Sequence, residues 1–214
     1  MGQIISISIG KPKSIPVKSS RPIKSSFIKT PIESKIFLGY EGFENDQVGD
    51  PRLHGGVDKA VCVYCKEHFV YWTNEKGLKL NAPAFGENLT VEGLLETQTN
   101  IGDVFNIGQA QVQVSQPRQP CHKINKVYDN QKMACWVKSS GFTGYYFRVI
   151  EQGWVAPGDK VIRVRKGEGT FSVDEINSFL SKSKGENNLQ RLAKAVKLDS
   201  LTDEWRKLLK KRLP

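Results

Sequence analysis

Short segments in which apolar and polar residues alternate, separated by turns that contain Gly or Pro, occupy most of the first 165 residues of this chain. Alternation with a period of two is typical of half-buried β-strands. Ile5, Ile7 and Ile9 alternate with serines in this way, residues 104–114 follow the pattern on both sides of a glycine, and residues 160–165 form a last such segment. The sequence therefore predicts a mainly β fold, with a hairpin or two adjoining strands at 104–114.

Four other segments complete this part of the chain. Residues 60–64 predict a short apolar strand that leads directly into a helix at 67–75, which ends before a glycine. Residues 37–50 are rich in Gly, Glu, Asn and Asp and predict a loop. Two prolines in 115–121 oppose a continuing central strand and fix the backbone, so we expect a stiff, extended loop there.

The pattern changes to helical after Gly167. Ser172 and Glu175 have the spacing of a capping box, which predicts a helix start. Apolar residues at helical spacing then recur in three groups up to the C-terminus. We predict a β domain over 1–167 and three short helices over 168–214, which form a small bundle leaning on the β domain because their own core is marginal.

The charge balance indicates an anionic partner. Lys and Arg number 32 against 22 Asp and Glu, a formal net charge of +10 at pH 7. Nucleic acid, a phosphorylated cofactor or an acidic protein fits this charge, and solubility alone explains it as well. Apolar runs are far shorter than the roughly 18 residues of a membrane helix, no secretion signal is recognisable, and four cysteines are too few for a disulfide framework. We expect a cytoplasmic protein.

Cys121 is the strongest single candidate for chemistry. It ends the proline-containing loop 115–121, and its neighbours include Arg118, His122 and Lys123. A thiolate is a soft metal ligand or a nucleophile, and nearby cations lower the pKa of a thiol. Free cysteines are more often small buried apolar residues. The polar, proline-bounded context nevertheless favours a functional thiol here.

The other cysteines are interpreted as structural. Cys62 and Cys65 have the C-x-x-C spacing of zinc and redox sites. Cys62 falls inside an apolar predicted strand, and no second ligand pair stands at a zinc-family spacing. We expect both thiols to be buried, and we expect the same of Cys135, between Ala134 and Trp136.

Residues 54–59 (His-Gly-Gly-Val-Asp-Lys) combine an imidazole, two glycines and a cation. Gly55 and Gly56 let backbone N–H groups approach an anion closely, His54 can titrate, and Lys59 adds positive charge. The segment can cradle a phosphate. It lacks the P-loop spacing, and a Gly-Gly turn with a surface lysine is also common without any ligand.

Two further polar segments are open to two interpretations. Glu87 and Asn88, in the turn at 85–89, can grip a polar heterocycle or cap a loop. The basic residues of 206–212 can contact nucleic acid or an acidic partner. Leucines at helical spacing among them favour the solvated face of an amphipathic helix instead.

Several of these segments, in this order, carry a resemblance to a known family: 42–46 (Gly-Phe-Glu-Asn-Asp), 54–61 (His-Gly-Gly-Val-Asp-Lys-Ala-Val), 85–89 (Phe-Gly-Glu-Asn-Leu), 101–103 (Ile-Gly-Asp), 116–121 (Gln-Pro-Arg-Gln-Pro-Cys) and 140–148. As a set they resemble the MOSC domain family (molybdenum cofactor sulfurase C-terminal domain), most of all its YiiM-like branch, over nearly the whole chain. Asn45 departs from the family, which more often has Gly there. Asn tolerates the left-handed conformation, so we expect the turn to be kept.

The resemblance implies a MOSC-type β-barrel and the molybdenum cofactor in its molybdopterin form. In that family the cysteine matching Cys121 is the thiolate ligand of molybdenum, and members reduce N-hydroxylated compounds such as base analogues, hydroxylamines and amidoximes. The implied site consists of Cys121 as metal ligand and catalytic residue, His54 as proton donor or supporting group, Arg118 and Lys59 as anion binders with Gly55 and Gly56, and Glu87 and Asn88 as pterin-recognition or loop-shaping residues.

The expected partners follow from what the chain lacks. It has no dinucleotide fingerprint and no iron–sulfur cysteine set, so electrons should come from a separate flavin or iron–sulfur reductase. The other partner is a small N-hydroxylated substrate, and neither a membrane nor nucleic acid is expected. Two alternatives remain: a non-catalytic carrier of cofactor or sulfur on Cys121, and a nucleic-acid-binding protein, which would show steeply salt-dependent binding.

Overall fold

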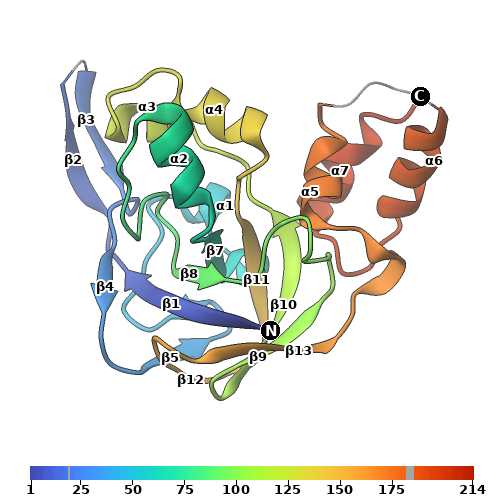
Figure 1. Ribbon diagram of the computed structural model, residues 1–214, viewed down its shortest axis with the longest axis horizontal. Coiled ribbons are helices and arrows are strands. Elements are labelled where there is room, and N and C mark those ends of the chain that lie inside the picture. The colour runs from blue at the N-terminus through green and yellow to red at the C-terminus, as the bar shows by residue number, and fades with distance from the viewer. Residues whose placement is uncertain (19, 182–185) are drawn as a thin grey trace.

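The computed structural model describes residues 1–18, 20–181 and 186–214, and its centre is a closed barrel of seven strands (Figure 1). In barrel order these are β13 (Lys160–Arg165), β9 (Val104–Ile107), β10 (Ala110–Pro117), β11 (Tyr145–Glu151), β7 (Val61–Cys65), β8 (Leu89–Glu92) and β1 (Gly2–Ile9). The pairing of Gly2 in β1 with Val161 in β13 closes the ring. Only β7 and β8 run parallel among these pairs. The mainly β prediction is confirmed.

The remaining strands lie outside the barrel ring. β4 (Thr30–Ile32) pairs with β1, whereas β12 (Gly153–Val155), β5 (Ile36–Gly39) and β6 (Gly42–Phe43) form a three-stranded sheet, and β2 (Lys13–Val17) and β3 (Ser20–Ser25) form a hairpin. The prediction of a loop over 37–50 was therefore wrong for its first half. Ile36 and Leu38, two positions apart in β5, are both buried, and the polar residues that follow obscured so short a strand.

The apolar face of β1 also differs from the prediction. Ile4 and Ile7 are the fully buried isoleucines, whereas Ile5 and Ile9 are only partly buried. The pairing of β1 with β8 shifts between Ile4 and Ser6, which marks a β-bulge. A bulge adds one residue to one strand, so alternation counted from the sequence changes face at that point.

Short helices cover the barrel. They are α1 (Pro51–His54), α2 (His68–Lys76), α3 (Lys123–Val127), α4 (Met133–Ser140) and the 3₁₀ turns η1 (Val57–Lys59) and η2 (Glu168–Thr170). The predicted step from strand into helix is confirmed by β7 and α2. The helix ends at Gly77, whose left-handed φ of 66° lets its N–H bond back to the carbonyl of Thr73.

Strand β10 continues further than expected. It extends to Pro117, which stands opposite Tyr145 of β11, so the expected loop begins at Arg118, three residues later than predicted. Proline is tolerated there because the pairing of β10 with β9 ends at Gln113, so Pro117 has a strand neighbour only in β11 and lies at a sheet edge on its other side. The strand thus delivers residues 118–121 from a fixed starting point.

Among the described residues after Gly167, the structure has three α-helices, α5 (Val173–Ser178), α6 (Glu186–Ala195) and α7 (Asp203–Lys210), which lie at one side of the barrel in Figure 1. That they form a bundle of their own, and that the chain divides at residue 167, stay predictions. The Ser172 side chain accepts a hydrogen bond from the N–H of Glu175 at 3.0 Å, which confirms Ser172 as the N-cap. The Glu175 carboxylate instead accepts from Arg191 at 2.7 Å, so the second half of the predicted capping box is replaced by an ion pair. Buried residues of these helices belong to the same hydrophobic cluster as the barrel interior. No helix in the described part of the chain is long and apolar enough to cross a membrane.

Candidate functional site

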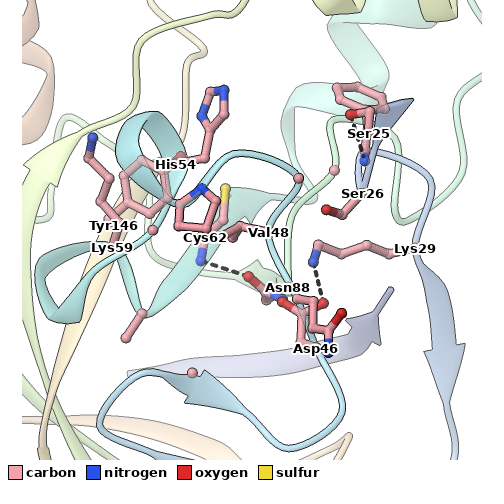
Figure 2. A pocket seen from close by; sticks show the side chains of 18 of the residues that line it. Ser25, Ser26, Lys29, Asp46, Val48, His54, Lys59, Cys62, Asn88 and Tyr146 are labelled. Atoms are coloured by element: carbon pink, nitrogen blue, oxygen red, sulfur yellow. Dashed lines mark hydrogen bonds and ion pairs between the residues drawn. The ribbon is translucent and has the colours of Figure 1, made fainter. Parts of the chain in front are cut away.

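A cavity of about 650 Å³ brings together segments that are far apart in the chain, and Figure 2 shows it from close by. Its walls come from the end of β3, the loop before α1, the turn at η1, strand β7, the loop before β8, the segment after β10, and β11. Seven of the eight predicted site residues line it: His54, Gly55, Gly56, Lys59, Asn88, Arg118 and Cys121. The structure therefore brings the separate segments that the sequence analysis assigned to one site together around a single cavity.

Cys121 lies on a loop that is fixed at both ends. The N–H of Arg118 donates to the carbonyl of Gly144 at 3.0 Å, and the Arg118 guanidinium donates to the carbonyl of Phe85. The carbonyl of Cys121 accepts from the N–H of Ile124 at 3.0 Å, where α3 begins. The half-buried thiol of Cys121 is thus held at the cavity wall.

Cys62 is a second thiol in the cavity lining, and its environment is different. It is 7% exposed, and burial raises the pKa of its thiol. A thiol must lose its proton to bind a metal, so Cys62 is the poorer ligand of the two. The predicted burial of Cys62 and Cys65 is confirmed.

The expected burial of Cys135 is wrong. Cys135 is exposed on α4, whose inward face carries the buried residues Met133 and Val137. Residues four apart share a helix face, and Cys135 falls between them on the other side. Its apolar sequence neighbours could not reveal this orientation.

The turn at 54–59 is held from two sides. Gly56 has φ 97°, a conformation that a residue with a Cβ rarely adopts, and its carbonyl accepts from the N–H of Lys59 at 2.9 Å. The Asp58 carboxylate accepts from Arg148 of β11 at 2.8 Å, and the Asp58 carbonyl accepts from the Ser115 hydroxyl at 2.6 Å. Barrel strands β10 and β11 therefore position the turn that carries Lys59 into the cavity wall.

The charges around His54 show that this part of the cavity is electropositive. Burial lowers the pKa of His54 below 6.5, and the positive charges of Lys123, Arg118 and Lys59 lower it further, against a smaller opposing effect of Asp50. Positive neighbours disfavour a protonated imidazole. His54 is therefore neutral at neutral pH, with one nitrogen that donates and one that accepts.

We expect His54 to titrate below pH 6.5 in a proton NMR titration of its imidazole signals. Lys123→Gln should raise the midpoint because it removes the second cause of the low pKa, and bound phosphate should raise it for the same electrostatic reason. Since the folded-state pKa is the lower one, the stability that neutral His54 contributes is complete above pH 6.5. It is lost as the pH falls through the folded-state pKa. A midpoint at or above 6.5 in the folded protein would contradict this electrostatic description.

Asn88 lines the cavity, but its own amide is used to build the wall. Its side-chain oxygen accepts from the N–H of Cys62 at 3.1 Å, and its NH₂ donates to the Ser8 carbonyl at 3.2 Å and to Asp46 at 2.8 Å. Asp46 also accepts from Lys29 at 2.5 Å, as Figure 2 shows. Of the two predicted roles of Asn88, these contacts favour loop shaping.

Glu87 is not part of the described cavity lining. It is 0% exposed, and its carboxylate accepts from the N–H groups of Ala84 and Phe85 at 3.1 and 2.7 Å and from the Thr90 hydroxyl at 3.1 Å. The Glu87 side chain therefore offers no surface to a pterin bound in the cavity. Glu87 instead shapes the loop whose Phe85 carbonyl anchors Arg118.

Several cavity residues were missed by the sequence analysis. Ser26, Phe27, Lys29, Asp46 and Lys123 line the cavity without having been assigned to it. The Ser26 hydroxyl is buried and has no hydrogen-bond partner among the described residues. The sequence analysis assigned no role to Lys29, and nothing in the local pattern around Ser26 marks that residue.

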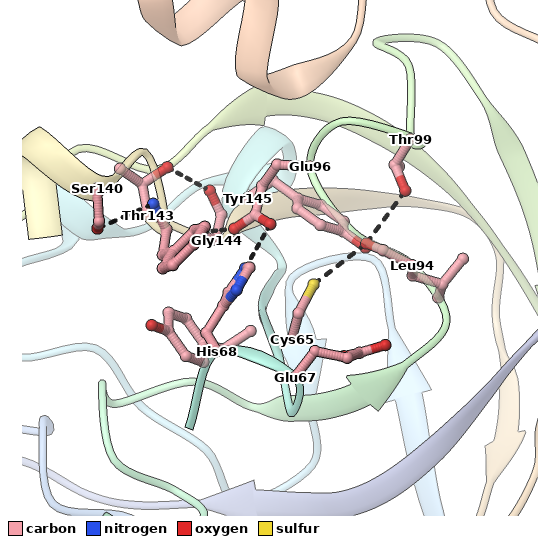
Figure 3. A network of polar contacts seen from close by, with 12 residues as sticks. Cys65, Glu67, His68, Leu94, Glu96, Thr99, Ser140, Thr143, Gly144 and Tyr145 are labelled. Carbon is pink, nitrogen blue, oxygen red and sulfur yellow. Dashed lines mark hydrogen bonds and ion pairs between the residues drawn. The ribbon is translucent and has the colours of Figure 1, made fainter. Parts of the chain in front are cut away.

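A buried polar network is connected to the loop of Cys121 through Gly144, and Figure 3 shows the network around Glu96 and His68. The Glu96 carboxylate contacts Nε2 of His68 at 2.6 Å and accepts from the N–H of Gly144 at 2.9 Å, and the Gly144 carbonyl in turn receives the N–H of Arg118. The ligand atoms of Cys65, His68 and Glu96 all lie within 4.8 Å of one another. Each already has a hydrogen-bond partner, so we interpret the cluster as support for the site.

Comparison with known proteins agrees with this architecture. The family model described as MOSC domain matches residues 50–162. YflK of Bacillus subtilis (strain 168), described as uncharacterized, is 40% identical over 203 residues, which cover 95% of this chain and 90% of YflK. A crystal structure of YiiM from Geobacillus stearothermophilus superposes with a TM-score of 0.81 at 34% identity and covers 100% of both chains.

A more distant relative bears a name that refers to chemistry. A protein of Gibberella moniliformis (strain M3125 / FGSC 7600), described as a reductase, is 26% identical over 195 residues, which cover 89% of this chain and 34% of that protein. The family model spans more than half of the chain, and the relation to YflK extends over nearly all of it. This protein belongs to the MOSC domain family.

Proposed function

We propose that this protein binds the molybdenum cofactor in the cavity lined by Cys121 and reduces N-hydroxylated compounds with it. The observation that carries the proposal is a partly exposed thiol in a cavity of about 650 Å³ that also contains Lys59, Arg118 and Lys123. Membership of the MOSC family supports the cofactor. The relative described as a reductase supports the direction of the chemistry.

The residues of the cavity fit the chemical parts of this cofactor. Molybdenum favours a soft ligand, which Cys121 offers. The cofactor phosphate requires cations and N–H donors, which Lys59, Arg118 and the turn at Gly56 offer at one part of the wall. The buried, unpartnered hydroxyl of Ser26 lines the same cavity and offers a hydrogen bond to a polar ring. When bound, the cofactor would supply two-electron oxygen-atom transfer.

The protein residues would then bind and orient the cofactor and supply protons to the substrate. Reduction of an N–OH group to N–H breaks the N–O bond, consumes two electrons and two protons, and releases water. His54 is neutral at neutral pH, so it can take a proton from solvent at one nitrogen and donate the proton at the other. Arg118, anchored to the Phe85 carbonyl, and Lys59 would bind the anionic part of the cofactor.

We also propose that the electrons come from a separate flavin or iron–sulfur reductase. The net charge of +10 favours a donor with an acidic docking surface. Such an interaction weakens as ionic strength rises.

The test is metal analysis combined with an activity assay. Protein purified from a molybdenum-replete host should contain molybdenum, protein from a host unable to make molybdopterin should not, and only the former should reduce an N-hydroxylated purine or a hydroxylamine with a competent electron donor. Absence of molybdenum from the first preparation would refute the proposal. Molybdenum without turnover on any of these substrates would favour a cofactor or sulfur carrier instead.

A further inference from the structure

The first turn of α7 is fixed to the strand that leads into the site. Thr202 is the N-cap of α7, and its hydroxyl accepts a hydrogen bond from the N–H of Trp205 at 3.3 Å. The same hydroxyl donates to the buried side-chain oxygen of Gln116 in β10 at 2.8 Å. Trp205 is 0% exposed in the shared core. A capped helix start with a buried aromatic anchor has little freedom to move. The residues of this turn therefore have defined positions relative to the cavity.

One residue of this turn reaches a cation of the cavity. The Glu204 carboxylate lies 2.5 Å from Nζ of Lys59, which Figure 2 shows beside Tyr146. The Lys59 side chain is 11% exposed and lines the cavity, whereas Glu204 is 50% exposed and is not part of the lining. A carboxylate from beyond residues 50–162, the part matched by the family model, thus neutralises a cation of the site.

Asp203, the acidic residue next to Glu204, is not paired with a cation of the cavity. Asp203 stands in the same first turn, its side chain is 82% exposed, and it pairs with Arg206 of its own helix at 2.8 Å. Asp203 and Glu204 carry the same charge at the same end of the same helix, so both interact favourably with the helix dipole. They differ in whether a cavity cation is the partner.

We propose that Glu204, through its ion pair with Lys59, limits how strongly the cavity binds a free anion. This inference rests on the proposed function, in which Lys59 binds an anionic group. An incoming phosphate must share the ammonium group with Glu204 and is repelled by its carboxylate. The cavity then binds a small anion weakly. A ligand that makes further contacts, such as a bond between a soft metal and the Cys121 thiolate, binds tightly.

The experiment titrates inorganic phosphate into the cofactor-free full chain at low ionic strength and follows binding by NMR of ¹⁵N-labelled protein. Glu204→Gln keeps the size of the side chain and removes the charge, so we expect phosphate to bind about threefold to tenfold more tightly. Asp203→Asn is the matched control, with the same change in net charge in the same helical turn, and should shift the dissociation constant by less than about twofold. A gain in affinity is a change that mere loss of structure does not produce.

A double-mutant cycle shows whether Glu204 acts through Lys59. In a Lys59→Met background, adding Glu204→Gln should change phosphate affinity by less than about twofold, because the cation that Glu204 restrains is gone. Equal effects of Glu204→Gln and Asp203→Asn, or unchanged or weaker binding by Glu204→Gln, would overturn this inference and leave the anion site intact. If neither the wild-type protein nor Glu204→Gln binds phosphate, the anion-binding part of the proposed function fails and this inference fails with it.

Discussion

Cys121→Ala should remove molybdenum from the purified protein and with it the reduction of N-hydroxylated substrates. The thiol of Cys121 is the accessible soft ligand in the cavity, and the alanine offers no replacement. Loss of a residue that only supports a ligand costs about 10- to 100-fold in metal affinity or activity, so loss of the ligand itself should cost more than about 100-fold. Molybdenum per chain and the rate of reduction are the measurements.

Two other cysteines make this experiment specific. Cys135→Ala removes an exposed thiol on α4, outside the cavity, and should leave both quantities unchanged. Cys62→Ala removes the second thiol of the cavity, whose raised pKa makes it a poor ligand, and should leave molybdenum in place. If Cys121→Ala retains cofactor and turnover, the assignment of the metal ligand is wrong, and loss of molybdenum from Cys62→Ala would assign it to that residue.

Local sequence patterns correctly predicted strands and helices whose formation is determined by residues close together in the chain. Strands at 104–107 and 160–165 and the helix capped by Ser172 follow from periodicity and capping, which act over a few residues. The face of β1 did not follow, because a bulge between Ile4 and Ser6 depends on pairing with β8. Periodicity describes one strand, whereas a bulge belongs to a pair of strands.

In the candidate site, too, features formed by adjacent residues were predictable and contacts between distant segments were not. Glycines and charged residues that are adjacent in the chain, such as those of 54–59, were recognisable from their spacing. Contacts such as Lys59 with Glu204, or Lys29 with Asp46, join residues of separate segments and leave no local pattern. They exist because the barrel closes and the C-terminal helices share its core, which long-range packing decides.

Glu87→Ala should be among the most destabilising single substitutions near the site. The carboxylate is 0% exposed and accepts hydrogen bonds from Ala84, Phe85 and Thr90, and the alanine leaves these buried donors without a partner. Each buried donor left unsatisfied costs about 1 to 3 kcal/mol. We expect the free energy of unfolding to fall by about 3 kcal/mol, measured by urea denaturation at pH 7.

The matched control for Glu87→Ala is Glu92→Ala, in the strand that follows Glu87. Glu92 pairs with Lys66 at 3.2 Å, and both side chains are 48% exposed, so its loss should cost less than about 1 kcal/mol. Because the loop held by Glu87 presents the Phe85 carbonyl to Arg118, Glu87→Ala should also weaken phosphate binding in the fraction that remains folded, which Glu92→Ala should not do. Equal losses of stability in the two variants would show that the Glu87 carboxylate does not organise this loop.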